Sequence, residues 1–287
     1  MSSEGVKTIL WSLVVVAALF PFEHVFPADP TPSRSARIRN LLYMPLVIMF
    51  SYGLQPYVNM LAATILKHGS LLSGVSVIAK SDWWSVVIFS LLFAFVWDVW
   101  QYWVHRLQHT SEYFWATHKF HHSETRLNAT AHSRTHVASY ILYVLLYTVM
   151  IPLIGAISPH WIVAFMMFRF WGYFIHANVR LRFGSLTPVI SGPQWHRIHH
   201  SALKEHHNKN FATFFPVIDV MFGTYYRPGR DEFPPTGLCD EREMSFVRAA
   251  TVEPLLIWSA IVRQGLARAS VLPRQRFPVG RVVSKQP

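Results

Sequence analysis

Residues 85–122 read SVVIFSLLFAFVWDVWQYWVHRLQHTSEYFWATHKFHH, and this stretch decides the fold. Its first part, Ser85–Val104, is apolar apart from Asp98 and matches the roughly 20 residues that a helix needs to cross a bilayer. Its second part holds five histidines, which begin directly after the apolar run. The stretch therefore predicts a membrane-spanning helix whose end carries a cluster of histidines.

Four further segments are apolar enough to lie in a membrane: Thr8–Phe22, Leu41–Leu66, Val137–Ile157 and Trp161–Ile175. No small-residue cleavage site follows the first, so we interpret it as a retained anchor rather than a signal peptide. Pro45 and Pro56 are expected to kink the second. The last two are expected to form a hairpin. The predicted fold class is all-α and integral to the membrane, with about four transmembrane helices.

The composition supports a membrane location. Apolar residues make up 52% of the chain and charged residues 14%, against about 25% charged in a soluble domain. The 26 Lys and Arg outnumber the 15 Asp and Glu, which suits a membrane surface, and we predict no nucleic-acid partner. The single cysteine, Cys239, excludes an intrachain disulfide and a thiolate metal cluster.

The distribution of positive charge predicts which side the histidines face. If Ser85–Val104 ends in the cytoplasm, only Lys7, Lys67 and Lys80 lie on the opposite side. This bias follows the positive-inside rule. Residues 105–136 and those after 176 then share the cytoplasmic face, where we expect a His-rich helical cap.

Histidines gather in three short sets on that face. His105 and His109 form a pair, and two later triplets have the spacing His-x2-His-His: His118, His121 and His122, then His196, His199 and His200. Residues three and four apart share one face of a helix, so each triplet can aim three imidazoles at one point. These eight side chains exceed the three or four ligands of one tetrahedral zinc site. They predict two metal ions that share the sets.

The ligand type leaves the metal open, because imidazole suits zinc, copper, iron and nickel alike. A haem needs only one or two axial histidines. Iron is favoured because oxidation of a lipid C–H bond must occur beside the acyl chains, whereas hydrolysis at zinc needs no membrane. Zinc is expected as a substitute acquired during purification.

At these motifs the chain resembles the fatty acid hydroxylase superfamily, the sterol desaturase-like integral membrane di-iron proteins, and most closely its bacterial branch. The resemblance rests on three stretches: Asp98–His109 (DVWQYWVHRLQH), His118–His136 (HKFHHSETRLNATAHSRTH) and His176–Tyr226, which ends in FGTYY. It implies metal ligation by the eight histidines above.

The same resemblance implies two further ligands. His176 matches the family's single histidine before the last triplet, and His136 matches the histidine after the pattern that ends at Arg134. His132 stands where the family has a small apolar residue, so it is expected to be structural or peripheral. His206 and His207 are expected to be solvated.

The implied protein is a single domain over residues 1–287, with a motif core at about 85–228, in a bacterial inner membrane. Its two irons would use O2 to hydroxylate or desaturate a lipid. The two electrons would come from a separate reductase with ferredoxin or a cytochrome, since the chain has no Gly-rich nucleotide motif. Two alternatives stay open: a His-rich metal-binding or transport protein, and a zinc-dependent lipid hydrolase with Glu124 as its base.

Two carboxylates are candidates for orienting ligand histidines. Asp98 lies two helical turns before His105 on the same face, and an aspartate in an apolar helix needs a polar partner. The alternative interpretation is that the Asp98 side chain snorkels to the membrane surface or forms a hydrogen bond between helices. Glu124 follows the first triplet by two residues, and its alternative is a solvated loop position.

The C-terminal part has a different character. Residues 244–270 are too poor in apolar side chains to cross a membrane and predict an interfacial helix. Residues 271–287 form a basic tail.

Overall fold

The computed structural model describes residues 3–29, 34–66, 82–143, 159–239 and 245–271. In these ranges the protein is helical, and its only β-type pairings are two isolated bridges, Pro27–Val179 and Ser201–Thr236. Three helices are long and apolar enough to cross a membrane: α1 (Ser3–Val25), α2 (Arg34–Leu66) and α4 (Trp83–Thr110). The predicted all-α membrane class is confirmed, whereas the predicted number of about four transmembrane helices stays a prediction.

The predicted hairpin is only partly within the described residues. Residues 137–143 are helical, but the rest of Val137–Ile157 lies outside the described ranges. Trp161–Ile175 falls in α7 (Pro159–His176), which packs along α4. The hairpin therefore stays a prediction. Pro45 and Pro56 lie inside α2, which is a single helix through both positions.

Helix α4 carries the chain from the apolar segment into the histidine region. Asp82 begins it, accepting a hydrogen bond from the backbone N–H of Ser85 at 2.8 Å. The helix extends beyond Val104 to Thr110, so His105 and His109 lie on its last turns. Ser111 ends α4 and also stands at the N-cap of α5 (Glu112–His122). A single residue thus separates α4, which carries the pair, from α5, which carries the first triplet.

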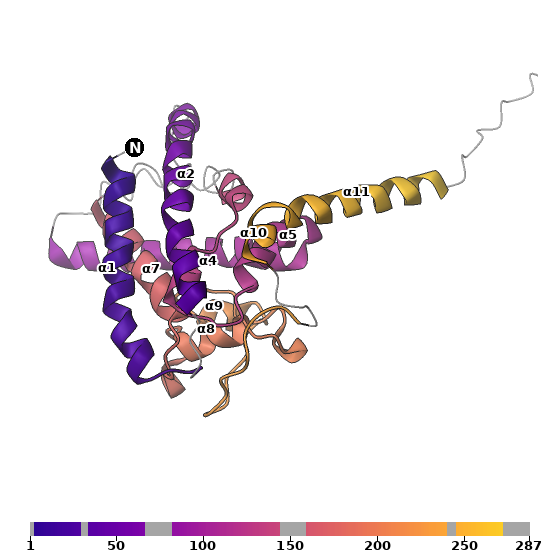
Figure 1. Ribbon diagram of the computed structural model, residues 1–287. Helices are drawn as coiled ribbons and strands as arrows, with labels where there is room; N and C mark the ends of the chain where they lie inside the picture. Colours follow the sequence, from indigo (N-terminus) through magenta and orange to yellow (C-terminus); the bar gives the residue numbers. More distant parts are fainter. Residues whose placement is uncertain (1–2, 30–33, 67–81, 144–158, 240–244, 272–287) are drawn as a thin grey trace, which may run out of the picture.

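The N-terminal helices are tied to the centre of the molecule by one buried acid. Helices α1 and α2 lie side by side (Figure 1). Glu23, 1% exposed, accepts hydrogen bonds from the backbone N–H groups of Ala129 (2.8 Å) and Asn178 (2.7 Å). Arg37 of α2 pairs with the same carboxylate at 2.6 Å. Ala129 starts the 3-10 helix η1 (Ala129–Ser133), so this carboxylate joins three segments distant in sequence.

The described elements between α7 and residue 239 are short. They are η2 (Gly184–Leu186), α8 (Pro193–His199), η3 (Lys204–His206) and α9 (Val217–Met221). Pro193 starts α8 at a position where its missing N–H costs nothing. Trp195 of α8 and Ile218 of α9 pack on Tyr102 of α4 in a fully buried cluster. This packing holds α8 against the last turns of α4.

The C-terminal segment forms two helices, α10 (Phe246–Thr251) and α11 (Glu253–Val271). Helix α11 projects away from the other helices (Figure 1). Its start is held on α5, because Lys119 pairs with Glu253 at 3.3 Å and the indole of Trp258 donates to the Tyr113 carbonyl at 2.8 Å. The helix predicted for 244–270 is therefore divided in two. Its position at a membrane interface stays a prediction, and residues 272–287 lie outside the described ranges.

Candidate metal centre

Nine histidines converge in two adjacent groups, each of which could hold a metal ion. The first group has five members, His105, His109, His118, His122 and His199, and the second has four, His121, His176, His196 and His200. Within each group the nearest ring nitrogens all lie within 4.8 Å of one another. Helices α4, α5, α7 and α8 contribute, so the groups form only when four elements pack together.

The structure divides each triplet between the two groups. His118 and His122 join the first group while His121 joins the second. In the last triplet the division is reversed: His199 joins the first group, and His196 and His200 join the second. The expectation that a triplet aims three imidazoles at one point is therefore wrong. Positions i, i+3 and i+4 span about 100° of a helix surface, which is wide enough to serve two neighbouring points. The two groups meet where the rings of His122 and His200 stack, with centroids 4.3 Å apart.

Ring nitrogens face one another inside each group. His118 Nε2 lies 3.1 Å from His105 Nε2 and 3.2 Å from His122 Nε2. In the second group, His176 Nε2 lies 3.1 Å from the Nε2 atoms of both His121 and His196. Two ligands at about 2.1 Å from one ion and at right angles would be about 3.0 Å apart. These separations suit a shared cation.

Three of these rings also bury a nitrogen that has no hydrogen-bond partner among the described residues and that an ion could meet. They are His109 with Nε2, His199 with Nε2, and His200, in which both nitrogens lack a partner. A buried polar atom without a partner costs free energy, and native proteins rarely tolerate several in one place. The donor set is all imidazole, which iron, zinc and copper accept. The residues present therefore fit two metal ions.

Backbone carbonyls fix the tautomer of three of the rings. The Nδ1–H groups of His105, His176 and His199 donate to the carbonyls of Phe211 (2.8 Å), Gly172 (2.6 Å) and Lys209 (2.9 Å) respectively. In a neutral ring this leaves the Nε2 lone pair free for a metal. Such outer hydrogen bonds orient ligands and raise their basicity.

Burial keeps the cluster uncharged. Loss of hydration, reinforced by neighbouring histidines, lowers the pKa of His118, His121 and His122 well below the ordinary value. The same causes act on the pKa values of His196 and His200. Neutral imidazole is the form that binds metal, so these rings are ready for ligation at neutral pH.

Asp98 acts on the loop after α8 and not on a histidine. Its Oδ1 accepts from the N–H of Thr213 at 2.8 Å, and its Oδ2 accepts from Phe214 at 2.9 Å and Phe215 at 2.7 Å. The ring nitrogen of His105 is occupied by the Phe211 carbonyl instead. The predicted contact between Asp98 and His105 is therefore wrong, because the carboxylate accepts hydrogen bonds from the backbone N–H groups of residues 213–215 instead. Asp98 supports His105 through the segment that carries this carbonyl.

A second buried acid, Asp219 on α9, completes the support of this segment. It accepts from the N–H groups of Phe211 (2.7 Å) and Ala212 (2.9 Å) and from the Thr224 hydroxyl (2.7 Å). Together, Asp98 and Asp219 satisfy five consecutive N–H groups, those of residues 211–215. Sequence reasoning did not select Asp219. Its signal is an acid inside the apolar run PVIDVMF at residues 216–222.

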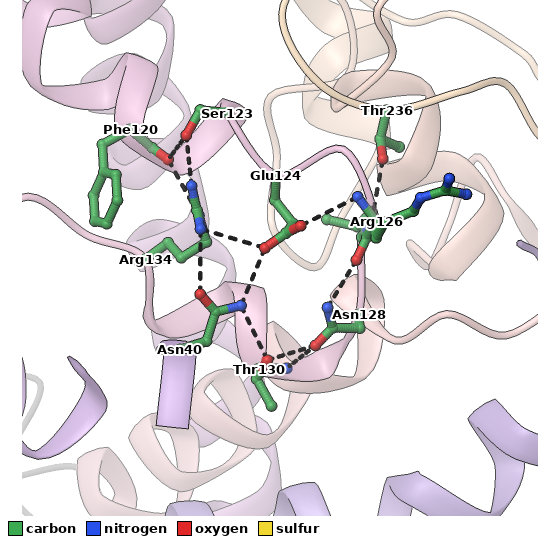
Figure 2. Close-up of polar contacts among 10 residues, drawn as sticks. Asn40, Phe120, Ser123, Glu124, Arg126, Asn128, Thr130, Arg134 and Thr236 are labelled. Carbon is green, nitrogen blue, oxygen red and sulfur yellow. Dashed lines mark hydrogen bonds and ion pairs between the residues drawn. The ribbon is translucent and has the colours of Figure 1, made fainter. Parts of the chain in front are cut away.

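Glu124 is buried, and its partner is an arginine. It pairs with Arg134 at 3.3 Å and accepts from Asn40 Nδ2 at 3.2 Å (Figure 2). No histidine contact is found for it among the described residues, so both the expected orienting role and the solvated alternative are wrong. Arg134 also donates to the Phe120 carbonyl and to the Ser123 hydroxyl at the end of α5. This network fixes the C-terminus of α5, the helix that carries the first triplet, against α2.

Four of the histidines outside the two groups have predictions that the structure bears on. His136 is not placed with the nine, and its Nδ1 accepts from the N–H of Ala138 at 3.1 Å. His132 lies beside His176, with ring centroids 5.3 Å apart, which fits a peripheral place. His207 is exposed. His206 is 2% exposed and bonds Ser201 Oγ (2.9 Å) and Glu232 (3.0 Å), so its predicted solvation is wrong.

A cavity of about 150 Å³ opens beside both groups. Its walls include His105 and His118 from the first group, and His121, His176 and His196 from the second. The walls also include residues of α4, of the helical residues 137–143 and of α7. A molecule in this cavity would lie against both candidate metal positions.

Comparison with known proteins finds similarity to several enzymes. The chain is 30% identical to the ornithine lipid hydroxylase OlsE of Rhizobium tropici over 51% of this chain and 44% of that protein. It is 30% identical to the human alkylglycerol monooxygenase, over 45% of this chain and 28% of that protein. It is 26% identical to the Delta(7)-sterol 5(6)-desaturase ERG3 of Saccharomyces cerevisiae, over 58% of this chain and 44% of that protein. The matches thus span less than half the length of these relatives.

No solved structure matches the chain. The model of the family described as fatty acid hydroxylase matches residues 90–224, a range that includes every histidine of both groups. The resemblance noted in the sequence is confirmed by this match: residues 90–224 of the chain are similar to the family described as fatty acid hydroxylase.

Proposed function

We propose that this protein is a membrane-bound di-iron oxygenase that hydroxylates or desaturates a C–H position of a lipid. The observation that carries the proposal is the pair of adjacent, buried, all-imidazole groups that share one cavity near the end of an apolar helix. The names of the relatives, a lipid hydroxylase, a monooxygenase and a desaturase, support the same class of reaction.

In this proposal, His105, His109, His118, His122 and His199 hold one iron, and His121, His176, His196 and His200 hold the other. Iron bound there would supply the activation of O2. The chain itself keeps the imidazoles neutral by burial and orients them through backbone carbonyls. His136, which is apart from both groups, is not assigned as a ligand.

The reaction requires an electron donor. Hydroxylation converts a C–H bond, O2, two electrons and two protons into an alcohol and one water. Desaturation removes two hydrogens from the lipid and reduces the same O2 to two waters. A separate reductase with ferredoxin or a cytochrome would deliver the electrons. The excess of Lys and Arg suits an acidic carrier and supports placing the centre on the cytoplasmic side of a bacterial inner membrane.

The zinc-dependent hydrolase is the weaker alternative. Its candidate base, Glu124, is engaged with Arg134 and Asn40 and is 4% exposed. Its oxygens are taken up by Arg134, Asn40 and the N–H of Arg126, and among the described residues no contact joins Glu124 to a histidine of either group, so the structure does not support its acting on a metal-bound water.

The test uses the full chain purified in mild detergent and loaded with iron. We would incubate it with membrane lipid extract, O2 and a chemical reductant, and follow lipid masses. The expected products gain one oxygen or lose two hydrogens, and both O2 and about two irons per chain are required. His121→Ala should abolish the product, whereas His207→Ala, at an exposed position, should not. Lipid cleavage by the zinc form without O2 would refute the proposal and support the hydrolase.

A further inference from the structure

The cavity beside the two histidine groups contains polar atoms that the proposed chemistry does not use. Gln108 and Ser139 line it, and each side chain is only 1% exposed. Gln108 Nε2 and Ser139 Oγ are buried and have no hydrogen-bond partner within the part of the chain that the structure describes. An unmet buried hydrogen-bonding group is costly, so two of them in the wall of one cavity indicate a ligand that meets both.

The orientation of the Gln108 amide defines what that ligand must offer. The Tyr143 hydroxyl donates to Gln108 Oε1 at 3.3 Å, which leaves the Nε2 donors for the cavity. Ser139 contributes a hydroxyl, whose proton can rotate toward an acceptor. Both side chains can therefore act as donors toward a ligand in the cavity.

The position of Gln108 relates this oxygen to the reacting carbon. Gln101, Val104, His105 and Gln108 all line the cavity from α4, so they share one face of that helix. Gln108 lies three residues after His105, a rise of about 4.5 Å along the axis. An oxygen bound by Gln108 would thus lie only a few bonds from a carbon held at the histidine groups.

The rest of the wall selects a neutral group. The lining contains no Lys, Arg, Asp or Glu among the described residues. An ammonium would therefore be buried without an opposite charge, which is strongly unfavourable, and a phosphate or carboxylate would find no cationic side chain in the wall, so that its charge could be met only by the metal ions of the proposed centre. The volume of about 150 Å³ is also small beside the roughly 300–1,000 Å³ of a cavity for a whole small ligand. It suits one segment of a lipid, with any charged headgroup outside.

We infer that this cavity is a polar subsite for a neutral oxygen of the lipid, a carbonyl, ether or hydroxyl oxygen close to the oxidised carbon, with Gln108 and Ser139 as the donors. The inference rests on the proposed function for the identity of the reaction. It narrows the substrate class to lipids that are oxidised near an uncharged oxygen and excludes oxidation in the middle of a plain hydrocarbon chain.

Binding measurements test the subsite without turnover. Tritiated 1-dodecanol is bound to the purified full chain in detergent and displaced by 1-dodecanol, methyl undecanoate or dodecane, which differ mainly in the oxygen. We expect the two oxygenated compounds to compete about ten-fold or more better than the alkane. Ser139→Ala and Gln108→Met should each reduce this preference several-fold.

Ser12→Ala is the matched control. Ser12 also buries an unpartnered hydroxyl, but it lies in α1 and does not line the cavity. The control should keep the wild-type preference. Equal competition by dodecane and dodecanol in the wild type, or an equal effect of Ser12→Ala and Ser139→Ala, would overturn the inference.

The two proposals fail separately. A ten-fold preference in a protein that forms no O2-dependent product would support the subsite and contradict the oxygenase. Product formation without any preference would overturn the subsite and leave the oxygenase in place.

Discussion

Replacement of Asp98 by asparagine tests how the outer shell supports the candidate metal centre. The carboxylate is fully buried and accepts three backbone N–H groups, one on Oδ1 and two on Oδ2. Asparagine has the same shape but only one acceptor oxygen. Whichever way its amide turns, at least one N–H loses its acceptor and faces an NH2 group.

The magnitude follows from that count. One buried donor without an acceptor costs about 1–3 kcal/mol, and the loss of charge weakens the bonds that remain, so we expect about 2–4 kcal/mol of destabilisation. For a chain of this size that lowers the thermal midpoint by about 5–15 °C. Residues 213–215 should shift, and the shift should weaken the hold of the Phe211 carbonyl on His105. Metal affinity should fall about 10–100-fold, as for other residues that orient metal ligands.

The assay compares Asp98→Asn with Asp82→Asn on the same helix. Asp82 caps α4 at an exposed position, where asparagine caps about equally well, so this control should match the wild type. Thermal midpoints and iron retained against a chelator are measured on both. If Asp98→Asn keeps wild-type stability and iron affinity, then the 211–215 segment does not depend on this carboxylate and our account is refuted.

Three further perturbations follow from the same contacts. His121→Ala leaves three ligands in the second group, and His199→Ala leaves four in the first. Elemental analysis should therefore show that iron falls to about one per chain in His121→Ala and falls by a smaller amount in His199→Ala. Equal loss of both irons in the two variants would contradict the division of the triplets. Arg134→Ala leaves the buried Glu124 charge unpaired and should cost about 3–5 kcal/mol in thermal unfolding, and a change below about 1 kcal/mol would contradict this. Gly172→Ala would place a methyl group against the His132 ring, closer than van der Waals contact allows, and should cost about 1–3 kcal/mol, whereas Gly53→Ala, with nothing within 4 Å, should be neutral or stabilising; equal midpoints would refute the clash.

Local pattern was sufficient for the membrane helices and for the histidine sets. Apolar runs of spanning length predict α1, α2 and α4 because a bilayer excludes unpaired backbone groups and forces such runs to be helical. The spacing of the triplets indicated a shared face, and the number of histidines indicated two ions. The order and spacing of these sets also carried the family resemblance, since both are properties of the linear chain.

The partners of the acids could not be predicted in this way. Asp98 meets residues more than 110 positions away, and Glu23 joins Ala129 and Asn178. A buried carboxylate needs donors, but which donors reach it depends on how distant segments pack. The local sequence shows that a buried acid requires hydrogen-bond donors, but it does not show which residues supply them. For this reason Asp98 and Glu124 were assigned to histidines.

The sequence by itself thus determined an all-α membrane protein with eight regularly spaced histidines, because helical periodicity and hydrophobicity act within a single segment. Only the tertiary structure decided that each triplet serves both groups, that His176 joins them while His136 does not, and that Gln108 and Ser139 face a common cavity. These outcomes depend on the relative placement of four helices, and the spacing within any one of them does not specify it.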